Sequence, residues 1–208
     1  MHIILGSQSR DRQKLLRNSN IPFTVIVSEY QENESLDLPP KELVLELAKG
    51  KANAVVEKVK KTCPKLIGKE AIIICADTMV EYQGQIIGKA KDRSDAIRIL
   101  SLLQGKIHEI HTAVVLVKYP ELHEKFFVAT TKVKFADLTS EMIERYISDE
   151  EYAGRAGAYS INERASLFIE WIEGSQTNVA GLPMSQLRSA MLEFGIDLLQ
   201  FAKNNQKD

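Results

Sequence analysis

The chain has 208 residues, of which 44% are hydrophobic and 26% charged, enough apolar side chain for the core of one domain or two closely joined lobes. The formal net charge is −1, so no overall positive field attracts nucleic acid or an anionic membrane, and a polyanionic ligand must meet a local cluster of cations. There is no apolar run of about 18 residues, no basic leader with a cleavage site and no metal-ligand spacing of the two cysteines, so we expect a cytoplasmic protein with reduced thiols.

The chain opens with an apolar strand at His2–Leu5, a polar turn and a short helix over Arg10–Leu16. Ser9 is a suitable N-cap and would direct free backbone N–H groups and hydroxyls toward one point. With Arg12 and Lys14 nearby, this turn is a candidate phosphate site. A strand–turn–helix opening is also common where no phosphate binds, so both interpretations stay open.

A second strand over Pro22–Val27 leads through a polar loop into a long helix over Lys41–Lys61. The apolar residues of this helix recur at spacings of three and four and predict one buried stripe. Lys51 falls inside that stripe. It is either a lysine whose stem covers the core while its ammonium stays in water, or a cation held toward a ligand.

The strongest functional signal is the stretch Ala71–Glu81. Ile72–Cys75 has the length and β-branching of a buried strand, and Asp77 follows it with Thr78 beside it. Because an unpaired charge is costly to bury, we expect Asp77 at the mouth of the strand, where α/β sheets usually bind ligands. The alternative is an aspartate that forms a turn and ends the strand.

The middle of the chain predicts further regular elements, namely a hairpin over Val80–Ile87, a helix that starts at Asp92, two strands over His108–Val117 and Lys125–Phe135, and a helix capped by Thr139. His108 and His111 are three residues apart, which places them on opposite faces of a strand and argues against a metal pair.

The last quarter of the chain contains a stretch rich in glycine and alanine, Ala153–Arg164. Its small residues either let another backbone or a flat ring approach closely, or belong to a mobile surface loop. A strand over Ser166–Ile172, a turn and a final helix beginning at Pro183 follow.

Several short motifs follow one another along nearly the whole chain. They are Ser7-Gln8-Ser9-Arg10-Asp11-Arg12, Glu32, Leu47-Ala48 with Lys51-Ala52, Ala76-Asp77-Thr78, Lys89, Ala156-Gly157-Ala158-Tyr159 and Gly181-Leu182-Pro183. In this order they resemble the motifs of the Maf family of nucleoside triphosphate pyrophosphatases. Each motif is weak alone, and seven in one order make the resemblance specific.

The resemblance implies a mixed α/β fold in which a twisted mixed β-sheet with flanking helices forms two lobes around a central cleft, as in inosine triphosphate pyrophosphatases. It implies a single Maf-like domain over residues 1–208. The implied activity is hydrolysis of a nucleoside triphosphate, a pyrimidine such as dTTP or UTP or a modified nucleotide, to the monophosphate and pyrophosphate. The alternative is a non-catalytic nucleotide-binding regulator of cell division. Dimerisation is an expectation from the family, and no nucleic-acid or membrane partner is implied.

The resemblance also assigns roles to residues. Asp77 is the implied catalytic acid–base, and Glu32 and Asp77 are the implied ligands of a Mg²⁺ or Mn²⁺ cofactor. The implied substrate-binding residues are Ser7, Ser9, Arg12, Lys51 and Lys89. Base choice is implied to depend on the positions held by Asp11, Thr78 and Asn162. Asp11 and Asn162 depart from the family pattern, which has arginine and glutamine or glutamate there, so activity is better supported than substrate identity.

Overall fold

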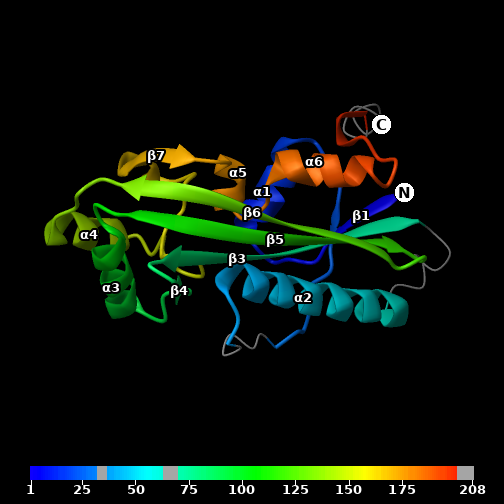
Figure 1. Ribbon diagram of the computed structural model, residues 1–208, viewed down its shortest axis with the longest axis horizontal. Helices are drawn as coiled ribbons and strands as arrows, with labels where there is room; N and C mark the ends of the chain where they lie inside the picture. The colour runs from blue at the N-terminus through cyan, green and yellow to red at the C-terminus, as the bar shows by residue number, and fades with distance from the viewer. Residues whose placement is uncertain (32–36, 63–69, 201–208) are drawn as a thin grey trace.

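The computed structural model describes residues 1–31, 37–62 and 70–200 and is built around a seven-stranded mixed sheet (Figure 1). The strand order is β2-β1-β3-β5-β6-β7, and β4 pairs with β3 outside this path. β1 runs parallel to β2 and β3, and the other pairs are antiparallel. The strands are β1 His2–Leu5, β2 Thr24–Val25, β3 Ala71–Tyr82, β4 Gln85–Ile87, β5 Ile107–Tyr119, β6 His123–Phe135 and β7 Ile169–Glu173. The predicted mixed α/β class is confirmed.

Helices flank this sheet on both sides. In Figure 1, α2 lies along one side of the sheet and α1 and α6 lie along the other, while α3 and α4 gather at the far ends of the long strands. The helices are α1 Arg10–Asn18, α2 Pro40–Thr62, α3 Arg93–Leu103, α4 Ser140–Ile147, the 3₁₀ helix η2 Arg164–Leu167, α5 Gln176–Val179 and α6 Met184–Leu192. Within the described part of the chain, no helix has the length and apolar character of a membrane span.

The long helix α2 forms as its sequence pattern predicts. Proline is favoured at the first position of a helix, where the missing N–H has no intrahelical partner, and Pro40 stands there. The residues of the predicted stripe are buried against β3 and β5, and they are Val44, Leu47, Ala48, Ala52, Val55 and Val59. Burying a large aliphatic side chain contributes about 1.5–3 kcal/mol relative to leaving it exposed, so this stripe fixes the helix on the sheet.

Three predicted N-caps are confirmed by their hydrogen bonds. The Ser9 hydroxyl accepts from the backbone N–H of Arg12 at 3.4 Å, and the Asp92 carboxylate accepts from that of Asp95 at 2.8 Å. The Thr139 hydroxyl accepts from the backbone N–H of Met142 at 3.3 Å. Each cap satisfies an N–H group that has no partner inside its helix.

The third strand differs from the prediction. β3 continues without interruption from Ala71 to Tyr82, so the predicted core strand and the first arm of the predicted hairpin are one element. The prediction that the strand ends before Asp77 is wrong, because residues 77–81 still pair with Glu109–Ala113 of β5. β2 is also shorter than predicted, and β7 starts later because residues 164–167 form η2.

Candidate active site

A notch in one edge of the sheet opens into a cleft. β1 pairs with Ala71–Ile74 of β3, and β4 pairs with Val80–Tyr82. In the described part of the chain, no strand pairs with residues 75–79 on this side of β3. A cleft of about 1080 Å³ opens there, at the upper end of the size of small-molecule sites.

The cleft brings together most of the residues that the sequence singled out. Its lining includes Ser7, Ser9, Asp11, Arg12, Lys51, Asp77, Thr78 and Lys89. Glu32 lies outside the described residues. The side chain of Asn162 is placed differently, because its Oδ1 accepts a hydrogen bond from Gln176 Nε2 at 3.4 Å, while its neighbours Ile161 and Glu163 line the cleft.

Asp77 and Lys51 form an ion pair in this cleft. Asp77 lies on the face of β3 that α2 covers, and Lys51 Nζ donates a hydrogen bond to Asp77 Oδ1. Only 13% of the Lys51 side chain and 10% of the Asp77 side chain are exposed. The ammonium is therefore directed at a carboxylate and not kept in bulk water, and each charge offsets the cost of burying the other.

Arg12 joins three separate segments of the chain. Its Nε donates to Gly181 O at 2.7 Å, and one terminal nitrogen donates to Ala76 O at 2.8 Å and to Ser7 Oγ at 3.1 Å. The other terminal nitrogen donates to Thr78 Oγ1 at 2.9 Å. The guanidinium thus satisfies a carbonyl of β3 in the notch, on the side where no described strand pairs with β3. We call Arg12 and these four acceptors the arginine clamp.

Thr78 continues the arginine clamp into the sheet. Thr112 Oγ1 donates to Asn178 O at 3.1 Å, and a hydroxyl has one hydrogen, so Thr78 is the donor in the 3.0 Å contact between the two threonine hydroxyls. The direction of donation is therefore Arg12 to Thr78 to Thr112 to Asn178. This chain ties α5 and the turn at Gly181 to the strand that carries Asp77.

The segment rich in glycine and alanine positions Lys89. Ala156 forms a β-bridge with Lys89, and the Gly157 N–H donates to Gly88 O at 3.2 Å. Gly157 has φ of +70°, and a Cβ there would lie 2.8 Å from a methyl carbon of Val80. Of the two interpretations of this segment, the close approach of another backbone is the one observed, at the bridge between Ala156 and Lys89.

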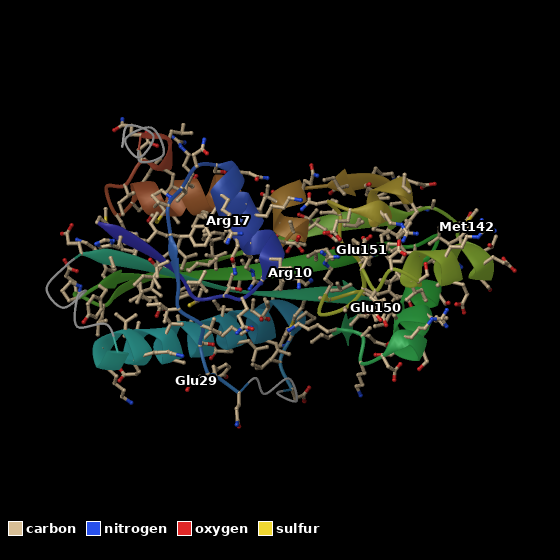
Figure 2. All side chains as sticks on the ribbon, turned by 180° about the vertical axis from the view of Figure 1, so that it is seen from behind. Arg10, Arg17, Glu29, Met142, Glu150 and Glu151 are labelled. Atoms are coloured by element: carbon tan, nitrogen blue, oxygen red, sulfur yellow. The ribbon has the colours of Figure 1, made fainter. Side chains whose placement is uncertain are left out.

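Sequence reasoning missed the acidic side of the cleft. Asp149, Glu150, Glu151 and Glu163 line it, as Arg10 does, and Figure 2 shows Glu150 and Glu151 on the segment after α4 and Arg10 at the start of α1. A run of three acids after a helix was the available signal, but an acidic run is usually a solvated surface. Its place in the cleft depends on how the segment folds back toward β3.

Arg155 organises this acidic side. It forms a two-pronged hydrogen bond with Glu163, at 2.8 and 3.0 Å, and its Nε lies 3.5 Å from Asp11 Oδ2. Burial alone would lower the pKa of Arg155, but the contacts with Glu163 and Asp11 outweigh burial and raise it. The hydrogen bonds from Arg155 lower the pKa of Glu163. The acids Glu163 and Asp11 on this side of the cleft are therefore held in place by one cation.

This arrangement suits a polyanion that must react with water. A carboxylate at the notch can orient or deprotonate a water molecule, and lysines from separate elements can neutralise phosphate oxygens. Asp77 also offers the hard oxygen ligands that Mg²⁺ and Mn²⁺ prefer, which is consistent with a divalent cation.

Comparison with known proteins gives consistent matches over almost the whole chain. The family model described as Maf-like protein matches residues 2–194. A "dTTP/UTP pyrophosphatase" of Carboxydothermus hydrogenoformans is 40% identical, with 94% of this chain and 100% of that protein covered. Proteins with the same name from Caldanaerobacter subterraneus and Bacillus cereus are 39% and 36% identical, each over 94% of this chain, with 91% and 97% of those proteins covered.

A solved structure, the Staphylococcus aureus Ham1 protein, shares 14% sequence identity and a TM-score of 0.36, with 66% of this chain and 73% of that chain covered. That likeness is too low to support a conclusion about this chain.

Proposed function

We propose that this chain, which belongs to the Maf-like protein family, is a nucleoside triphosphate pyrophosphatase acting on dTTP and UTP. The oxygen of a water molecule bonds to the α-phosphorus, and the bond from that phosphorus to the oxygen bridging to the β-phosphorus breaks. Pyrophosphate leaves with the electron pair, and the monophosphate remains. The observation that carries the proposal is the Asp77–Lys51 ion pair in a cleft of about 1080 Å³ whose lining also includes Lys89 and Ser7.

Asp77 acts on the attacking water. Its carboxylate accepts the proton that the water loses as the bond to phosphorus forms, and base catalysis of this kind contributes typically about 10²–10⁴-fold. Lys51 holds the carboxylate in place from α2. Because both side chains are almost buried, their positions are set before the substrate arrives, which limits reorganisation during the reaction.

The phosphate chain is bound by groups from separate elements. Ser7 and Ser9 contribute from the turn before α1, Lys51 from α2 and Lys89 from the segment after β4. Arg12 contributes positive charge, but its main task is to hold Ser7 and β3 through the arginine clamp. A divalent cation held by Asp77 would neutralise charge on the triphosphate and on the leaving pyrophosphate.

Pyrimidine choice is assigned to Asp11 and Thr78, which line the cleft, and to Asn162, whose two neighbours line it. Asp11 is oriented by Arg155 and Thr78 by Arg12, so both side chains are held in one place. A rigid polar wall discriminates between bases by leaving its own groups unpaired when the wrong base binds.

The test is release of pyrophosphate from a panel of UTP, dTTP, CTP, ATP, GTP and methylated pyrimidine triphosphates, with products separated by chromatography. We expect UMP plus pyrophosphate from UTP. Asp77→Asn should lower kcat by at least about 100-fold while the chain stays folded. Asp37→Asn, at an exposed position outside the cleft, is the matched control and should retain activity. Release of UDP and phosphate, or binding without turnover of any triphosphate, would overturn the proposal.

A further inference from the structure

Two glutamates lie next to each other on adjacent strands near the end of β3. Glu81 pairs directly with Glu109 of β5, on the face that α2 covers further along the strand. Their side chains are only 23% and 33% exposed. Like charges directly opposite each other destabilise a sheet, and a cation between them would offset that cost.

His111 presents one ring nitrogen to both carboxylates. Its Nε2 lies 2.9 Å from Glu81 Oε2 and 3.6 Å from Glu109 Oε2. The ring is fully buried, and its Nδ1 lies 3.0 Å from Thr130 Oγ1 on β6. In metal sites the second nitrogen of a ligating histidine is usually held by a hydrogen bond that fixes the ring, and Thr130 occupies that place.

The spacing of the three donors fits a single ion. One ligand atom from each residue lies within 4.8 Å of the other two. Ligands of a tetrahedral Zn²⁺ at about 2.0–2.2 Å lie about 3.3–3.6 Å from one another, so the Glu109 contact already fits and the Glu81 contact must open slightly.

We propose that Glu81, Glu109 and His111 bind a divalent transition-metal ion such as Zn²⁺, with water in the remaining position. The site is separate from the cleft, because none of the three residues lines it. Glu81 also lies four residues along β3 from Asp77, about 13 Å at the rise of a strand. The ion joins β3 to β5 next to the β3–β4 turn, and so stiffens the segment that leads to Lys89. This proposal does not depend on the nucleotide chemistry.

The test uses the full chain freed of metal and titrated with Zn²⁺ alone, without nucleotide. We expect a Zn²⁺ site whose affinity falls at least tenfold in His111→Asn and in Glu109→Gln. His123→Asn, an exposed histidine on β6, is the matched control and should bind as the unaltered chain does. Asp77→Asn should also keep this site, which separates it from any ion in the cleft.

Two further measurements locate the ion. Anomalous diffraction from crystals soaked in Zn²⁺ should show a peak about 2 Å from His111 Nε2. Zn²⁺ should raise the melting temperature of the unaltered chain and of His123→Asn, but not that of Glu109→Gln. The Glu109→Gln variant keeps the test decisive if His111→Asn does not fold. Zn²⁺ binding that is equal in all variants, or no peak between the three side chains, would overturn the proposal.

Discussion

Replacing Arg12 by alanine should lower the free energy of unfolding, because Arg12 donates hydrogen bonds to β3 in the notch. The substitution removes the donor for two buried carbonyls, Ala76 O and Gly181 O, whereas the hydroxyls of Ser7 and Thr78 can rotate to other partners. Each buried acceptor left unsatisfied costs about 1–3 kcal/mol, so the two together cost about 2–6 kcal/mol. That is a large part of the roughly 5–15 kcal/mol by which a domain is stable.

The free energy of unfolding is measured by urea denaturation followed by circular dichroism. Arg12→Lys should lose nearly as much stability as Arg12→Ala, because an ammonium cannot reproduce the planar fork that reaches all four acceptors. Arg10→Ala is the matched control, since Arg10 is exposed in the same turn and lines the same cleft. It should change the free energy of unfolding by less than about 0.5 kcal/mol.

One result would refute this reasoning about Arg12. If Arg12→Lys stays within about 1 kcal/mol of the unaltered chain while its KM for UTP rises at least tenfold, then Arg12 acts directly on the phosphates and the arginine clamp is not what holds the notch.

Three further predictions follow from the described contacts. Lys51→Met leaves the nearly buried Asp77 carboxylate without this partner and should lower the free energy of unfolding by about 3 kcal/mol. Adding Asp77→Asn to the same chain should restore most of that loss, as measured by urea denaturation of both variants. Gly181→Ala should cost about 1–3 kcal/mol and lower kcat, because φ is +90° and the new Cβ would lie 3.3 Å from Arg12 Nε. Burial lowers the pKa of His108 from 6.5 to about 3, so between these values only the unfolded chain takes up the proton. Stability should therefore fall as the pH falls through this window, by up to about 1.4 kcal/mol per pH unit, and His108→Gln should flatten that slope.

Each of these has a clear contrary outcome. A double variant at Lys51 and Asp77 that is less stable than Lys51→Met alone would contradict the ion-pair account. Full activity in Gly181→Ala would show that the turn tolerates a side chain beside Arg12. An unchanged pH slope in His108→Gln would assign the acid sensitivity to another group.

Local structure was readable from the sequence because its determinants lie within a few residues of each other. The stripe of α2 and the cap at Asp92 were both predicted and are both observed. Asp77 and Lys51 were also identified from the chain alone, since each is a charge in an apolar pattern. Nothing in their local sequence showed that the two charges neutralise each other, because they lie on different elements.

The tertiary structure decided how these pieces meet. It extended β3 past Asp77, because the partner strand β5 is long enough to pair with every residue up to Glu81. It gave Arg12 an acceptor at Gly181, 169 residues away along the chain, and placed Glu109 opposite Glu81 through strand register. The physical reason is that local propensity depends on neighbouring residues, whereas register and long-range hydrogen bonds depend on which distant segments bury their apolar faces together.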